Sequence, residues 1–157
     1  ALPENFGLEY ADSDNVFRRP VMIHCAKAGS IERFFGVLVE HYAGAFPLWL
    51  APVQVSVTPV ADRHLDYARE VGERLEAAGL RTEVDASSDR LGEKIRRAMT
   101  SKHPLVLVVG DQDVENGTVG VRRHGEKRER RAVPLAEVVQ SLADEALPPG
   151  GLAERRP

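Results

Sequence analysis

The chain has 157 residues, of which 43% are hydrophobic and 29% charged, an ordinary composition for a globular protein of one domain and a fragment. Its formal net charge of −3 provides no general attraction to nucleic acid, so any such contact must depend on a local basic patch. A single cysteine, Cys25, excludes an internal disulfide and favours a cytoplasmic location. No apolar run approaches the roughly 18 residues of a membrane span, so we expect no membrane partner.

The first elements expected along the chain are short. Leu8 and Tyr10 indicate a strand, and residues 12–15 have the composition of a turn. Residues 21–26 follow a proline and predict a short, mostly buried strand. Ser30 is a suitable N-cap for an amphipathic helix that ends near Gly44. The apolar stripe of this helix consists of Ile31, Phe34, Phe35, Leu38, Val39 and Tyr42.

A proline-bracketed apolar connector at 46–52 is expected to be packed, and we place a domain boundary after residue 48. Beyond it strands alternate with helices. This pattern predicts a three-layer α/β domain over 49–147, in which helices pack on a mixed sheet of about five strands. The unbroken apolar run 105–109 is typical of a central strand. The remaining expectations are strands at 53–60, 80–84, 118–122 and 130–133, helices at 62–78, 91–102 and 134–146, a hairpin turn at 115–118, and a disordered tail at 148–157.

The turn from Gly29 to Arg33 has features of an anion-binding site. Glycine lets a ligand approach the backbone, and a helix N-terminus offers unpaired N–H groups. Arg33 adds a forked positive charge suited to phosphate and a plane that can stack on a base. The alternative is an ordinary strand-to-helix turn with a solvated arginine.

The segment 122–131 is the best local phosphate-binding patch, because six Lys or Arg stand there against two Glu on an expected hairpin. The alternative is a solvated, self-repelling hairpin. His24, in an apolar run, is either a satisfied core residue or a metal ligand, and one imidazole does not make a zinc site.

Several segments resemble bacterial threonyl-tRNA synthetases, and the likeness extends over nearly the whole chain to about Glu145. The most specific stretches are Arg-Pro-Val-Met-Ile-His at 19–24, Gly-Ser-Ile-Glu-Arg-Phe at 29–34, Glu-His-Tyr-Ala-Gly-Ala-Phe-Pro at 40–47 and Trp-Leu-Ala-Pro-Val-Gln-Val at 49–55. The resemblance implies that residues 1–48 are the end of a class II catalytic domain and that 49–147 are a class IIa anticodon-binding domain. It identifies Gly29 and Arg33 with the third class II motif, whose arginine contacts ATP.

Further roles follow from the resemblance alone. His24 corresponds to a histidine that binds zinc together with an upstream Cys and His, neither of which this sequence contains. Arg122 and Asp113 correspond to anticodon contacts, with Asp113 in place of the usual Glu. Apart from the resemblance, the neighbouring Arg123 of the basic segment is expected to contact tRNA. The helical Lys94 is expected to contact the tRNA backbone, and the alternative is a solvated helical face.

The segment 85–92 departs from the family pattern Asp-x-Arg-Asn-Glu-Lys-Ile-Gly. Ser87 stands where the family has Arg, and Ser88 where it has a base-reading Asn. A hydroxyl cannot make the paired hydrogen bonds of an amide with a base edge, so Ser88 is expected to read a base less specifically.

We therefore expect tRNA binding as the C-terminal part of a threonine–tRNA ligase that uses ATP, Mg²⁺ and zinc when complete, with the chain alone inactive in aminoacylation. Its expected partners are tRNA, the remaining catalytic region or a partner subunit, and a second copy in a homodimer. The alternatives are a non-catalytic nucleic-acid-binding protein and a regulatory protein whose helical stripe at 31–42 binds another chain.

Overall fold

The computed structural model describes residues 2–26, 28–126 and 128–150. It divides into two units, with the division between Val37 and Leu38 inside a helix. The expected domain boundary after residue 48 stays a prediction, and most of the tail expected at 148–157 lies outside the described residues.

The first unit contains few and short elements. It consists of α1 (Leu2–Asn5), the antiparallel pair β1 (Tyr10–Ala11) and β2 (Phe17–Arg18), and the first part of α2 (Ile31–His41). The turn between β1 and β2 is held by Arg18, which pairs with Asp12 and Asp14 at 2.8 Å. At the start of α2, Ser30 Oγ accepts the Arg33 N–H at 3.4 Å, as the N-cap prediction required.

The buried strand expected at 21–26 is wrong. These residues are not in a strand, and the side chains of Val21 and Ile23 are 91% and 90% exposed. A strand persists only when a neighbour pairs with its backbone. Within the described ranges, no strand of the chain pairs with this segment.

The second unit is built on one five-stranded sheet in the order β4-β3-β5-β6-β7. β4, β3 and β5 are parallel, whereas β6 and β7 are antiparallel additions, so the mixed sheet is confirmed. The strands are β3 (Val55–Pro59), β4 (Thr82–Val84), β5 (Leu105–Val109), β6 (Thr118–Arg123) and β7 (Glu129–Pro134). The helices are η1 (Asp62–His64), α3 (Leu65–Ala77), α4 (Leu91–Thr100), α5 (Asp111–Asn116) and α6 (Leu135–Glu145).

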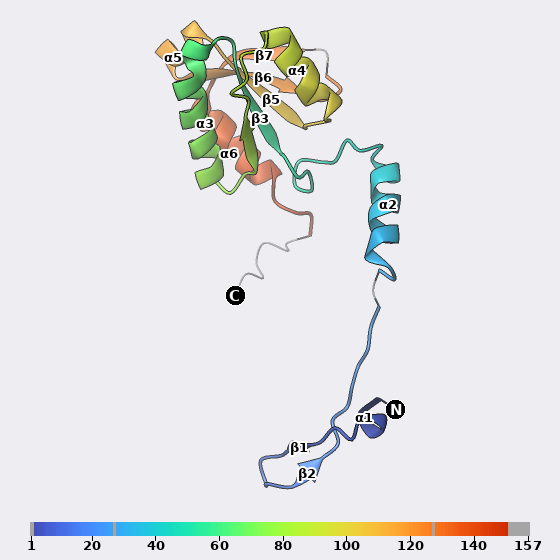
Figure 1. The fold of residues 1–157 in the computed structure, drawn as a ribbon. Helices are drawn as coiled ribbons and strands as arrows, with labels where there is room; N and C mark the ends of the chain where they lie inside the picture. The colour runs from blue at the N-terminus through green and yellow to red at the C-terminus, as the bar shows by residue number, and fades with distance from the viewer. Residues whose placement is uncertain (1, 27, 127, 151–157) are drawn as a thin grey trace. The chain divides into compact units, whose positions relative to one another are not determined.

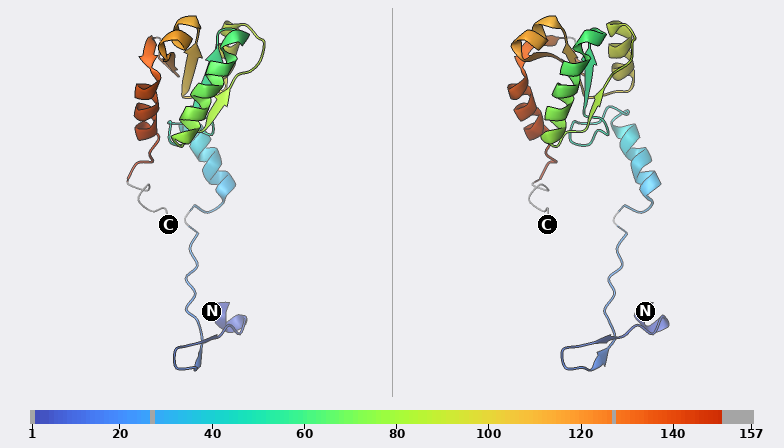
Figure 2. Two further views of the ribbon diagram at one scale, coloured as in Figure 1. Left: turned by 90° about the vertical axis from the view of Figure 1, so that its left-hand side faces the viewer. Right: turned by 60° about the vertical axis from the view of Figure 1, so that its left-hand side comes forward.

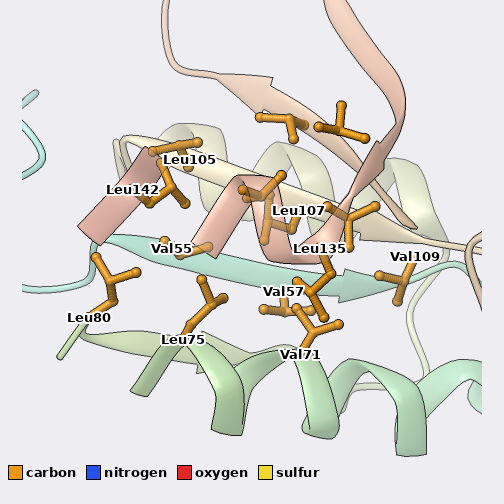
Figure 3. Packing of buried hydrophobic residues seen from close by; sticks show 14 of the residues in the cluster. Val55, Val57, Val71, Leu75, Leu80, Leu105, Leu107, Val109, Leu135 and Leu142 are labelled. Atoms are coloured by element: carbon orange, nitrogen blue, oxygen red, sulfur yellow. The ribbon is translucent and has the colours of Figure 1, made fainter. Parts of the chain in front are cut away.

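Helices cover the sheet on both faces, which confirms the three layers (Figures 1 and 2). α3 and α6 pack on one face, where alternate strand residues such as Val57, Leu107 and Val119 join Leu75 and Leu142 in the main core (Figure 3). α4 packs on the other face over Val106 and Val108. Leu48 of the connector is buried in the main core, so the connector is packed as expected.

The hairpin turn expected at 115–118 is also wrong. The chain forms the short helix α5 there, with Gly110 as N-cap, and ends it at Gly117, whose φ is 65°. The left-handed conformation favours glycine and lets the chain reverse into β6. Among the residues that the structure describes, no helix is long and apolar enough to cross a lipid bilayer.

Candidate functional site

A groove of about 700 Å³ lies on the face of the sheet that α4 covers only in part. It begins at the carboxyl ends of β3 and β5 and continues over β6 and β7. α3 and α4 pack on opposite faces, and β4 and β5 lie on opposite sides of β3. The carboxyl edge between such strands is where open α/β sheets usually bind ligands. The groove is lined by Val60, Leu91, Ile95, Val108, Gly110–Asp113, Asn116, Thr118, Gly120, Arg122, Glu129, Arg131 and Ala132.

The floor of the groove is open because Gly120 has no side chain. Gly120 pairs with Val108 of β5. A Cβ at this position would lie 3.2 Å from Glu129 Oε1 and 3.5 Å from the Val108 carbonyl oxygen. An isolated glycine in a strand pattern often marks such a close approach, and this signal was available in the sequence.

One wall of the groove is polar and carries mixed charge. Arg122 donates from NH2 to Glu129 Oε2 at 3.1 Å, and Arg131 NH2 lies 3.7 Å from the same oxygen. The Arg122 Nε is buried and has no hydrogen-bond partner in the described part of the chain. This wall thus offers a ligand both hydrogen-bond donors, from the arginines, and acceptors, from the carboxylate of Glu129. It lies beside a bulge between β6 and β7, where Ala132 has a φ of 52°.

The start of α5 also lines the groove. Asp113 accepts the Gly110 N–H through Oδ2 at 3.0 Å and the Thr118 hydroxyl through Oδ1 at 2.8 Å. The carboxylate therefore joins the beginning of α5 to the beginning of β6. A carboxylate oxygen can accept two hydrogen bonds, and within the described residues each Asp113 oxygen accepts one.

α5 is attached to the end of β3 by a second cluster. Arg63 donates two hydrogen bonds to Asp111, at 2.8 and 2.7 Å, and the buried His64 contacts Asp111 at 2.8 Å. These hydrogen bonds, from Arg63 first and His64 second, hold the pKa of Asp111 well below its usual range. His64 and Asp111 are 47 positions apart, and no local pattern of the sequence pairs them.

The loop after β4 is organised by Arg97 of α4. Its guanidinium donates to Asp89 at 2.7 Å, to Asp85 at 2.6 Å and to Ser87 Oγ at 2.8 Å. Burial alone would raise the pKa of Asp85, but hydrogen bonds from Ser87 and Arg97 outweigh it and lower the pKa. Arg97 is a functional candidate that the sequence analysis missed, since its role depends on tertiary contacts.

The structure separates the five residues expected to contact tRNA. Arg122 and Asp113 both line the groove, the first from β6 and the second from α5. Ser88 is exposed in the loop at 85–90 that Arg97 holds, three residues before the groove residue Leu91. Arg123 faces the other side of the sheet and binds Glu145 of α6 at 2.8 and 2.6 Å. Lys94 is buried, with Nζ 3.5 Å from the Pro59 carbonyl, rather than on a solvated helix face.

The residues expected near ATP and zinc lie in the first unit. Gly29 has a φ of 64°, and Arg33 is exposed in the first turn of α2. His24 and Cys25 are also exposed. No group of three or more His, Cys, Asp or Glu within the described ranges is placed to hold a metal ion. These residues therefore do not fit a zinc site unless ligands come from elsewhere.

The fold and the groove define a small α/β binding domain with its site at the carboxyl edge of parallel strands. The family described as an anticodon binding domain matches residues 54–145. The threonine–tRNA ligase of Nocardioides sp. is 52% identical over 141 residues, which are 90% of this chain and 21% of that protein. That of Anaeromyxobacter dehalogenans is 53% identical over 149 residues, 95% of this chain and 23% of that protein.

A solved structure is similar as well. The RNA-binding domain of threonyl-tRNA synthetase from Cryptosporidium parvum has a TM-score of 0.75 and 29% identity, and the match covers 94% of this chain and 38% of that one. The chain belongs to the anticodon-binding domain family and corresponds to the region of threonine–tRNA ligases that carries this domain. It spans about a fifth of the length of these ligases, as the 21% and 23% show.

Proposed function

We propose that the groove binds an unpaired base of a tRNA anticodon loop. The observation that carries this proposal is that Arg122 of β6 and Asp113 of α5 line the same groove, in a chain of this family. Sequence-specific RNA recognition usually targets unstacked loop bases, which can be hydrogen-bonded along their edges.

The charges of the groove favour a base over a phosphate. Three carboxylates, Asp111, Asp113 and Glu129, line it together with Arg122 and Arg131. A phosphate has only acceptors and would be repelled by the carboxylates. A base edge has both N–H donors and acceptors, so it suits a wall that offers both kinds of partner.

The whole-protein role remains part of the proposal. In a complete threonine–tRNA ligase, this chain would hold the anticodon end of tRNA, while ATP, Mg²⁺ and zinc would serve a catalytic region of which residues 1–48 are the end. Gly29 and Arg33 would contribute an ATP contact, and His24 one zinc ligand of a site completed elsewhere. We expect the chain alone to be inactive in ATP–pyrophosphate exchange. A cytoplasmic location and a homodimer also stay predictions.

Binding to a hairpin RNA tests the proposal. We would measure the dissociation constant of the 157-residue chain for a hairpin with a threonine anticodon loop, and for the same stem with a permuted loop, at one salt concentration. The threonine loop should bind more tightly, and Arg122→Ala should weaken its binding about tenfold, because a charged hydrogen bond is lost.

Arg130→Ala is the matched control. It removes the same charge from the same hairpin, but Arg130 lies beside Glu137 and Val138 outside the groove. Equal losses for the two variants, or equal binding of the two loops, would contradict a base-reading groove. Equal binding of the loops would instead favour the alternative of a less specific nucleic-acid-binding protein.

A further inference from the structure

The carboxylate of Glu129 occupies the place in the groove that an RNA acceptor would take. Its Oε2 lies 3.1 Å from Arg122 NH2 and 3.7 Å from Arg131 NH2. Its Oε1 lies 3.2 Å from the point where a Cβ on Gly120 would stand, so the carboxylate extends across the floor. Only 20% of the Glu129 side chain is exposed.

The carboxylate of Glu129 partly neutralises the positive charge of the hairpin at 122–131, to which it belongs. Two arginines of the groove share one carboxylate, and that carboxylate is shielded from water on most sides. A charged acceptor in such a position competes directly with any other acceptor for the same donors. The buried Nε of Arg122 has no hydrogen-bond partner in the described structure.

We infer that Glu129 is a specificity-determining residue, which admits to the groove only an RNA group that donates hydrogen bonds to it. This inference rests on the proposed function of the groove. A base edge with N–H donors can satisfy the carboxylate while its acceptors bind Arg122. A phosphate, or a base without donors at that position, would leave a shielded carboxylate facing an acceptor, which is costly. Glu129 thereby weakens binding of mismatched loops more than binding of the matched loop.

The test is a comparison of Glu129→Gln with the unchanged chain on the two hairpins described above. Glutamine keeps the size of the side chain and removes its charge. We expect the permuted loop to bind about tenfold more tightly and the threonine loop to change by less than about threefold, so the ratio of the two constants falls. The slope of log K against log salt should steepen for the permuted loop by about 0.7 for each new phosphate contact.

Glu137→Gln provides the matched control. It makes the same charge change, and Glu137 pairs with Arg130 of the same hairpin at 3.7 Å, outside the groove. The Glu137→Gln variant should leave the ratio of the dissociation constants for the two hairpins unchanged. A thermal unfolding curve for each variant confirms that the fold is retained.

Three outcomes would overturn the inference. Equal weakening of both loops by Glu129→Gln would show that Glu129 merely positions Arg122. No change in either loop would show that the carboxylate does not compete with RNA. An identical effect of Glu137→Gln would attribute the change to net charge. The proposed function fails separately, if the unchanged chain does not discriminate between the loops and Arg122→Ala has no effect.

Discussion

His64 Nε2 lies 2.8 Å from Asp111 Oδ1 and joins η1, which follows β3, to the start of α5. The other ring nitrogen, Nδ1, accepts the Ala61 N–H at 3.2 Å. In the neutral ring this geometry places the proton on Nε2, which then donates to the carboxylate. Two loops at the carboxyl edge of the sheet are thereby held together beside the groove.

Asp111→Asn should lower the thermal unfolding midpoint by roughly 5 °C near pH 7, because it weakens the bonds to Arg63 and His64. The pKa of Asp111 is lower in the folded chain than in the unfolded one, where it is about 3.9. The stabilisation is therefore complete above about pH 5 and is lost as the pH falls through the folded pKa. The difference between the unfolding midpoints of the unchanged chain and of the Asp111→Asn variant should become smaller below about pH 4.

Asp66→Asn is the control for this prediction, because Asp66 is exposed and its ion pair within the described residues is with Arg69, at 3.4 Å. Its midpoint should stay close to that of the unchanged chain at every pH. A pH-independent difference for Asp111→Asn would show that its ionised form does not stabilise the fold.

Arg97→Ala should loosen the loop at 85–90 and lower the unfolding midpoint by roughly 4 °C, since two carboxylates lose their partner. Binding of the threonine loop should weaken about threefold, with an unchanged salt slope, because Arg97 acts by holding the loop. Arg96→Ala, on the exposed side of the same helix, should change neither the midpoint nor the loop. A salt slope reduced by about 0.7 would instead show that Arg97 contacts a phosphate.

Gly120→Ala should affect stability and RNA binding in opposite directions. Alanine in a strand is more favourable than glycine by about 0.5 kcal/mol, and the atom nearest to the new methyl group is Glu129 Oε1 at 3.2 Å, at the end of a side chain that can shift to relieve the contact. The same methyl group reduces the space above the groove floor, so RNA should bind more weakly, and more weakly still with Gly120→Leu. Urea unfolding and RNA titration measure the two effects. Unchanged RNA binding by the leucine variant would exclude the groove floor from the site.

Leu75→Ala should lower the free energy of unfolding by about 2–5 kcal/mol, because it leaves a cavity in the main core. Val114→Ala, on the exposed side of α5, should change it by less than about 0.5 kcal/mol. Urea unfolding of the whole chain measures both changes in the free energy of unfolding. Similar losses would mean that α3 does not contribute the packing seen here.

Lys94→Met should keep or raise stability, by up to about 1 kcal/mol, because a buried ammonium with one distant carbonyl partner is replaced by an apolar chain. We expect RNA binding to be unchanged, since the amine is covered in the folded chain. A weaker, less salt-dependent complex would instead support the tRNA contact that we expected of Lys94 from the sequence.

The sequence alone predicted the alternation of strands and helices from 53 to 146 to within a few residues. Apolar periodicity and the stop signals at Gly79 and Pro104 are local properties, and α3, α4 and β5 follow them. The two elements that sequence reasoning got wrong depend on neighbours. Residues 21–26 have the composition of a strand but no strand beside them in the described structure, and α5 replaces a turn because Gly110 and Asp113 cap it.

The residue types of the site could also be predicted from the sequence, but which of these residues contact one another could not. Arg122 and Arg123 are neighbours in the chain, yet alternation along β6 sends one to the groove and the other to Glu145. The pairing of Arg122 with Glu129 and of His64 with Asp111 depends on strand register and helix placement, which long-range packing sets. Local sequence therefore determined most of the elements and the charges they carry. Only the tertiary structure decided which charges face one another, because strand register and helix packing bring distant residues together.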